Sequence, residues 1–223
     1  MSADHGHDGG PGGHGPELVH DGPGYFDQVA GSWDDDPAKV ERARVVAEQI
    51  VAELDRSADT RLFEYGAGTG LVAEHLQHHV GALTLADNSV GMRDAMAAKV
   101  ADGRLPGGTR IWDLDLATQA VPAGERFDLA VTVQVLHHVP DLDPVLAGFA
   151  ALLEPGGQLC IVDLELEDGT FHGDGFGGHH GFRREQLGEQ LEAAGFAGVT
   201  FQHAYDLEKN GHAYPLFLAI ATR

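Results

Sequence analysis

Residues 62–70 read LFEYGAGTG, and this stretch decides the fold that the rest of the sequence predicts. Leu62, Phe63 and Tyr65 form a short apolar and aromatic run of the kind that builds a buried strand, and a helical pattern follows Gly70. Glycine at every second position of the turn permits a sharp bend and lets a ligand approach the main chain with no Cβ in the way. The stretch therefore predicts a strand, a ligand-binding turn and a helix.

The glycine spacing separates this turn from the fingerprint of dinucleotide-binding dehydrogenases. That fingerprint, G-x-G-x-x-G, directs a helix N-terminus at a pyrophosphate, whereas Gly66, Gly68 and Gly70 follow G-x-G-x-G. Glu64 stands two residues before the first glycine, where a carboxylate repels a pyrophosphate but suits a ligand with ammonium and sulfonium charge. The pattern E-x-G-x-G-x-G resembles the first motif of the class I S-adenosylmethionine-dependent methyltransferases.

The resemblance continues at the ends of the next predicted strands. Residues 83–86 end at Asp87 within LADNSVGM, where the family places an acid on the two ribose hydroxyls. The following strand ends at Asp113, at the family position for the adenine amino group. FDLAVTVQVLHHVPD (127–141) resembles the fourth strand and the loop closing over the methyl group, and LLEPGGQLCIVD (152–163) resembles the next helix end, turn and fifth strand.

The cofactor that this resemblance implies is S-adenosyl-L-methionine. We expect it to contact Tyr25, Trp33, Glu64, Gly66, Ala67, Gly68, Gly70, Asp87, Asn88, Met92, Asp113, Leu114 and Gln134. The two aromatic residues are included because YFDQVAGSWD, beginning at Tyr25, resembles the opening helix of ubiquinone and menaquinone methylases; ordinary core packing is the alternative.

The implied fold is α/β, with a doubly wound, Rossmann-like sheet of seven strands and an N-terminal helical cap. The family order is 3-2-1-4-5-7-6, with strand 7 antiparallel. Besides the strands above, helices are expected over 70–79, 89–101, 142–153 and 184–194, and strands over 158–162, 199–204 and 216–221. Two further helices from Tyr25 onward break at Asp36-Pro37, and residues 155–157 predict a turn.

Histidines dominate the part of the sequence expected to meet the methyl acceptor. His137 and His138 follow the fourth strand and are candidate catalytic bases, with packing or helix capping as the alternative. The glycine-rich segment 163–182 is typical of a lid over the acceptor. Its candidate substrate contacts are His172, His179 and His180, joined by Tyr205 from the C-terminal part.

Metal binding by this segment is an open alternative, as is a solvated loop, and no residue is assigned to a metal. The Mg²⁺ mechanism of catechol methyltransferases is disfavoured because Gln134 replaces their acid at the end of strand four. Arsenite methylation requires several thiolates, and Cys160 is the only cysteine of the chain.

Composition limits the partners. The chain has 223 residues, with 35 acidic against 14 basic side chains and a formal charge of -21, which disfavours nucleic acid, anionic membranes and polyanionic substrates. Solubility alone is the alternative reason for this acidity. No apolar run approaches about 18 residues and the start has no apolar signal region, so we expect a cytoplasmic protein, monomeric or homodimeric.

The sequence divides into two parts. Residues 1–24 contain His5, His7, His14 and His20 among many glycines and are expected to be a disordered tail with adventitious metal binding, while 25–223 form one methyltransferase domain. The favoured function is methyl transfer to a small molecule. The alternative is a non-catalytic cofactor-binding or metal-handling protein that uses the histidine-rich tail.

Overall fold

A computed structural model describes residues 23–54, 58–173 and 175–223. Its helices are α1 (Pro23–Val29), the 3-10 helix η1 (Ala30–Asp35), α2 (Pro37–Glu53), α3 (Leu71–Leu76), α4 (Val90–Ala101), the 3-10 helix η2 (Leu136–His138), α5 (Asp143–Leu152) and α6 (Arg184–Ala193). Its strands are β1 (Leu62–Tyr65), β2 (Leu83–Ala86), β3 (Arg110–Trp112), β4 (Phe127–Val133), β5 (Leu153–Leu164), β6 (Ala197–Lys209) and β7 (His212–Thr222).

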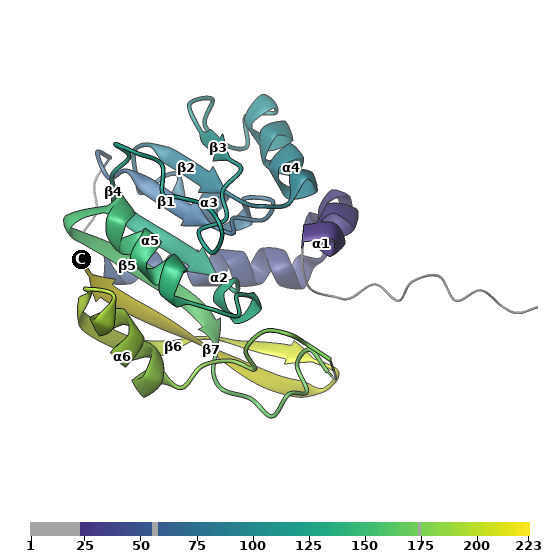
Figure 1. Ribbon diagram of the computed structural model, residues 1–223. Coiled ribbons are helices and arrows are strands. Elements are labelled where there is room, and N and C mark those ends of the chain that lie inside the picture. The colour runs from purple at the N-terminus through teal and green to yellow at the C-terminus, as the bar shows by residue number, and fades with distance from the viewer. Residues whose placement is uncertain (1–22, 55–57, 174) are drawn as a thin grey trace, which may run out of the picture.

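The strands form one seven-stranded sheet in the order β3-β2-β1-β4-β5-β7-β6. The first five strands pair in parallel, and β7 runs antiparallel to both β5 and β6. Helices cover both faces of this twisted sheet (Figure 1). The predicted fold class and strand order are confirmed.

Side chains of β1 alternate between two hydrophobic clusters, one on each face of the sheet. Leu62 joins the cluster that contains the buried residues of α2 and α3, whereas Phe63 joins the cluster that contains those of α5 and α6. All four residues of β1 are buried, as a strand covered on both faces requires. The turn that follows β1 is thereby held on a rigid element.

Local capping explains where two of the helices begin. The side chain of Asp36 accepts a hydrogen bond from the Ala38 amide and Pro37 occupies the first turn, so the predicted break before α2 is confirmed. The Ser89 hydroxyl accepts from the Met92 amide and caps α4. This capping fixes the start of α4 directly after the polar end of β2.

The last three strands are longer than the sequence pattern suggested. A turn was expected over 155–157, but β5 includes these residues, because Gly156 and Gly157 exchange main-chain hydrogen bonds with Arg223 at the chain's end. Strands β6 and β7 also extend further and meet at Asn210-Gly211, where both residues have positive φ. That dipeptide is the preferred sequence of a two-residue hairpin turn.

Candidate functional site

The glycine-rich turn lies between β1 and α3, and its three glycines all have positive φ. A Cβ on Gly66 would lie 2.3 Å from Cγ2 of Val135, so a side chain cannot be accommodated there. A Cβ on Gly68 would meet only the sulfur of Met92, at 4.0 Å. The turn is therefore tight on the side of β4, whereas the main chain of Gly68 remains approachable.

Asp87 connects this turn to the start of α4. One carboxylate oxygen accepts a hydrogen bond from the Gly68 amide and the other from the Ser89 amide, each at 2.9 Å. Burial raises the pKa of Asp87, although these two hydrogen bonds oppose the shift. Each oxygen keeps a second lone pair, so the carboxylate can also accept hydrogen bonds from a ligand diol.

Glu64 is buried at the end of β1, close enough to Asp87 for the two carboxyl groups to interact. Burial raises the pKa of Glu64 to about 8; Lys99 opposes the shift and Asp87 adds to it. Among the described residues, no group donates a hydrogen bond to its Oε2 atom. A buried carboxyl group with an unused oxygen fits a ligand that brings a cationic donor.

Two acidic side chains connect the N-terminal segment, here the helices α1 and η1, to this site. Asp27 of α1 accepts hydrogen bonds from the Ser89 hydroxyl at 2.6 Å and the Gly91 amide at 2.9 Å. Asp34 of η1 accepts from the Thr69 hydroxyl at 2.6 Å. Its second oxygen lies 2.7 Å from the Lys99 ammonium. The N-terminal segment is thus fastened both to the glycine-rich turn and to α4, which lies beside α1 in Figure 1.

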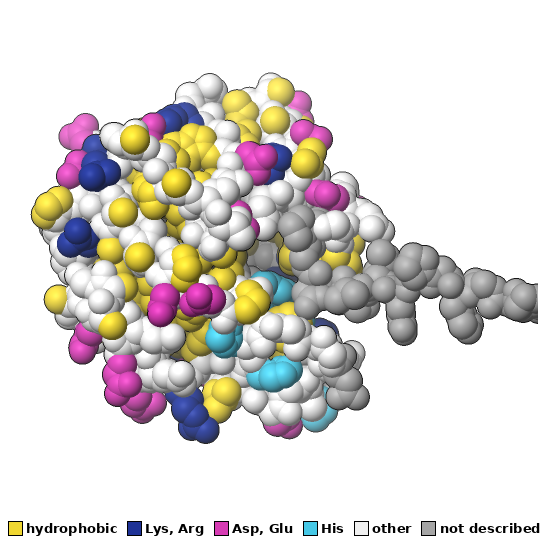
Figure 2. Space-filling model, in the orientation of Figure 1, with side chains coloured by type: hydrophobic (Ala, Val, Ile, Leu, Met, Phe, Trp, Pro, Cys, Tyr) yellow, Lys and Arg dark blue, Asp and Glu magenta, His cyan; other side chains and the backbone are white. Residues whose placement is uncertain are grey.

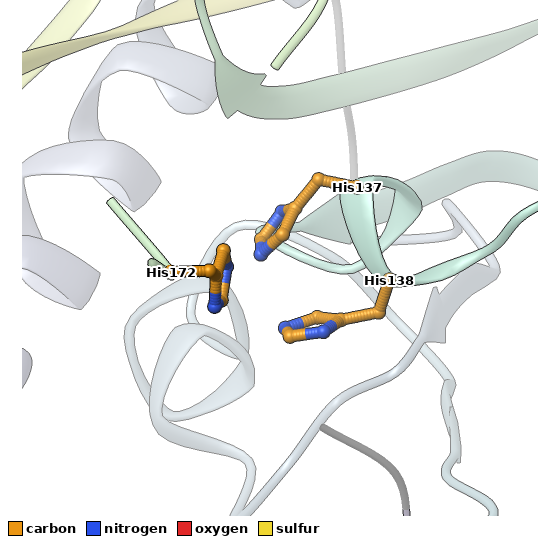
Figure 3. Close-up of side chains that lie close together, drawn as sticks. All are labelled: His137, His138 and His172. Atoms are coloured by element: carbon orange, nitrogen blue, oxygen red, sulfur yellow. The ribbon is translucent and has the colours of Figure 1, made fainter. Parts of the chain in front are cut away.

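Three histidines come together beyond the end of β4. His137 and His138 belong to η2, and His172 lies in the loop between β5 and α6; one ring nitrogen of each lies within 4.8 Å of the others. Figure 3 shows the three rings pointing toward one another. Residues 34 positions apart in the chain therefore share one small volume.

A buried carboxylate orients the first of these rings. Nδ1 of His137 lies 2.6 Å from Oδ1 of Asp163, whose side chain is fully buried at the end of β5. Burial alone would raise the pKa of Asp163, but His137 and hydrogen bonds from neighbouring amides bring it below its ordinary value. The carboxylate accepts from Nδ1, so Nε2 is the nitrogen left for another partner.

His138 differs from His137 in having no such partner. Burial, together with the neighbouring His137, lowers the pKa of His138 to about 3, and Asp163 only partly opposes this shift. Nδ1 of His138 is buried and forms no hydrogen bond with any described residue. This shift favours the neutral form of the His138 ring.

The loop after β5 packs directly on these histidines. The His179 amide donates a hydrogen bond to the His137 carbonyl at 2.7 Å, and the Phe176 ring stacks on His172 with centroids 3.8 Å apart. His180 turns to Glu167 instead, at 3.2 Å. Figure 2 shows the histidine side chains of this face gathered in one region, while acidic side chains are dispersed around it.

Comparison with known proteins identifies the family. Residues 39–200 match the sequence profile of a family described as a methyltransferase domain. The chain belongs to this methyltransferase family. The match includes the glycine-rich turn, both strand-end acids and the histidine cluster, and the resemblance predicted from the sequence is confirmed.

Relatives and solved structures extend this finding. The chain is 24% identical over 159 residues to a ubiquinone biosynthesis O-methyltransferase of Brucella ovis, with 63% of this chain and 61% of that protein covered. It is 30% identical to an S-adenosyl-L-methionine-dependent Diels-Alderase of Talaromyces variabilis, over 68% of this chain and 52% of that one. It thus spans less than two thirds of the length of either curated relative.

The fold matches that of the N-methyltransferase NodS from Bradyrhizobium japonicum, which was solved in complex with S-adenosyl-L-homocysteine. The TM-score is 0.68 at 19% identity, covering 90% of this chain and 97% of that one.

The other residues predicted to contact the cofactor differ in burial and in their bonding partners. Gln134, directly after β4, has a positive φ of 55°, and its main-chain N–H donates a hydrogen bond to the Val162 carbonyl of β5. Asp113 is exposed and pairs with Arg93 at 3.1 Å. The remaining predicted cofactor contacts comprise exposed Asn88, buried Ala67, Met92 and Leu114, and partly buried Tyr25 and Trp33.

Tyr205, the predicted substrate contact from the C-terminal part, packs on one of the two hydrophobic clusters. It is partly buried on β6 and packs on the cluster that contains α2. Sequence reasoning missed Asp27 and Asp34 as site residues, although acids in YFD and WDDD were visible, and it included Asp163 only in the metal-binding alternative for residues 163–182. The expected tail lies outside the described residues, except for Pro23 and Gly24, which form the start of α1.

Within the part of the chain that the structure describes, no helix has the length and apolar character needed to cross a membrane.

Proposed function

We propose that this protein is an S-adenosylmethionine-dependent methyltransferase that acts on a small-molecule acceptor. The observation that carries the proposal is the pair of buried carboxyl groups, Glu64 and Asp87, beside the approachable main chain of Gly68. The chain has this arrangement within a methyltransferase-family domain. The relative named as S-adenosyl-L-methionine-dependent and the structural neighbour with bound S-adenosylhomocysteine support this cofactor, and the relative named as an O-methyltransferase supports methyl transfer.

The residues at the strand ends fit the chemical groups of this cofactor. Asp87 would accept hydrogen bonds from the ribose hydroxyls, and Glu64, once ionised, would pair with the amino group. Asp113 and Leu114, after β3, would contact the adenine. The N-terminal segment, fastened by Asp27 and Asp34, would cover the bound cofactor and keep water out.

When bound, S-adenosylmethionine supplies an electrophilic methyl group. The work left to the protein is to hold an acceptor atom in line with it, within about 3 Å, because displacement at a sulfonium needs little covalent help. His137, His138 and His172 surround the acceptor side in this proposal, and His179 and His180 flank it. A neutral or cationic metabolite fits the formal charge of -21 better than an anionic one.

The cytoplasmic location, the monomeric or dimeric state and the role of Tyr205 as a substrate contact belong to the same proposal.

The test is a screen of the full chain against a library of small metabolites, with S-adenosylhomocysteine formation as the readout. Acceptor-dependent formation is expected, and Asp87→Asn should reduce it at subsaturating cofactor. A protein that binds the cofactor but forms no S-adenosylhomocysteine with any acceptor would contradict methyl transfer. It would instead favour a Diels-Alderase, the activity named for the Talaromyces relative.

A further inference from the structure

The histidines after β4 and in the loop after β5 bring together imidazole nitrogens to which none of the comparisons assigns a role. Among the described residues, His137, His138 and His172 form the one group of three metal-ligating side chains whose donor atoms lie within 4.8 Å of one another. We propose that these three imidazoles bind a single divalent transition-metal ion, with Zn²⁺ as the reference ion, on the acceptor side of the methyltransferase site.

The spacing requires only a small contraction. A point equidistant from three atoms at this separation lies about 2.8 Å from each, and a zinc–imidazole bond is about 2.0–2.1 Å, so each ring must move inward by about 0.7 Å. His172 lies on a loop, where such a shift is cheaper than in a helix or strand. His137 and His138, both in η2, supply the other two ligands.

The surroundings of the first ring match those of histidine ligands in known metal sites. Asp163 binds Nδ1 of His137 at 2.6 Å, which directs Nε2 away from the carboxylate. This carboxylate–histidine arrangement fixes the tautomer and ring orientation of many metal-bound histidines. Asp163 also places a buried negative charge beside the three neutral imidazole ligands.

The other two rings are held by apolar contacts and by the loop itself. Phe26 and His138 form a T-shaped pair with ring centroids 5.6 Å apart, and Phe176 stacks on His172. A Cβ on Gly178 would lie 2.1 Å from the His137 carbonyl oxygen, so glycine allows the loop to pack directly against η2. Nδ1 of His138 is buried without a hydrogen-bond partner among the described residues, so this nitrogen is available to coordinate a metal ion.

The donor chemistry selects the ion. Neutral imidazoles suit Zn²⁺, Cu²⁺, Ni²⁺ and Fe²⁺, whereas Mg²⁺ prefers oxygen ligands. Three protein ligands leave a fourth position open on zinc, as in catalytic sites. If the proposed methyltransferase function holds, this position would take the oxygen or nitrogen atom of the acceptor, which limits the acceptors to molecules with a metal-binding hydroxyl, amine or enol group.

The experiment compares full-length wild-type protein with His172→Ala by titration with Zn²⁺ and by the absorption spectrum after loading with Co²⁺. The control is His203→Ala, which removes a histidine that is 55% exposed on β6. The four histidines in residues 1–22 are present in every protein, so their binding cancels in the comparison. S-adenosylhomocysteine binding is measured on the same samples.

Wild type and His203→Ala should bind one more tight equivalent of Zn²⁺ than His172→Ala. Asp163→Asn should keep that equivalent but bind it about 10- to 100-fold more weakly, as expected when the residue orienting a ligand is removed. The Co²⁺ form of wild type should show the intense visible bands of four- or five-coordinate cobalt, a readout that does not depend on any variant.

Equal stoichiometry and affinity in wild type and His172→Ala, or only the weak spectrum of six-coordinate cobalt in wild type, would overturn the metal site. Binding of S-adenosylhomocysteine should be unchanged in His172→Ala. If no protein binds that ligand but the zinc difference persists, the proposed function fails and the metal site stands.

Discussion

Ionisation of Glu64 provides a quantitative test of how the site recognises its cofactor. The pKa of this buried group is raised to about 8 in the protein alone, so the carboxyl group keeps its proton at neutral pH. A ligand ammonium requires the carboxylate, and binding must therefore release that proton. Affinity should rise with pH up to about the pKa of Glu64 in the free protein.

The size of the effect follows from that pKa. If Glu64 is fully ionised in the complex, binding at pH 7 releases about 0.9 proton, and the dissociation constant falls about 25-fold between pH 6.0 and 7.5. The ligand's own amino group stays mostly protonated in this window, since α-amino groups have a pKa of about 7.7–8.0. The pH dependence of the complex thus reports mainly on the protein.

The assay is calorimetric titration with S-adenosylhomocysteine in pairs of buffers with different ionisation enthalpies. Glu64→Gln is the matched variant: it should bind more weakly at pH 7.5, with less than half the proton release and a shallower pH dependence. Asp87 is intact in both proteins, so the difference isolates Glu64. An identical pH dependence in the two proteins would refute the pairing of Glu64 with the ligand ammonium.

Three further predictions concern the framework of the site. Gly66→Ala should destabilise the fold by about 3 kcal/mol in urea unfolding, since it adds a clash to the strain of a positive φ, whereas Gly103→Ala, with φ +76 but open space, should cost about 1 kcal/mol; equal losses would contradict the packing argument. Asp34→Ala should destabilise by about 1–3 kcal/mol and weaken cofactor binding, because it leaves a buried lysine with one acidic partner fewer and frees the N-terminal segment; unchanged binding would contradict the covering role. Cys160 should resist thiol reagents at pH 8 until the protein unfolds, because burial raises its pKa to about 12, and rapid labelling of the native protein would contradict this.

Local patterns in the sequence were sufficient for the framework of the fold. The apolar run at β1, the spacing of the glycines and the helix break at Asp36-Pro37 each act within a few residues, and each is found where predicted. The extension of β5 depends instead on pairing with the chain's last residues. The last two strands were expected to pair as a hairpin, but the sequence signal for its turn at Asn210-Gly211 was missed.

The composition of the candidate site was harder to predict. His137, His138 and His172 were each candidates, but their convergence depends on how the loop after β5 folds back onto η2. Asp27 and Asp34 lie within the stretch YFDQVAGSWD, but only its aromatic residues Tyr25 and Trp33 were predicted as cofactor contacts. The importance of these two acids emerges from the hydrogen bonds they accept across the fold.

The most direct test of the central claim is the affinity of the full chain for S-adenosylhomocysteine, measured for wild type, Asp87→Asn and the exposed control Asp102→Asn. The account predicts saturable binding by wild type and the control, and binding at least about tenfold weaker in Asp87→Asn, since one charge-assisted acceptor of the ribose hydroxyls is lost. Failure of wild type to bind at millimolar ligand, or equal affinity in all three proteins, would contradict it.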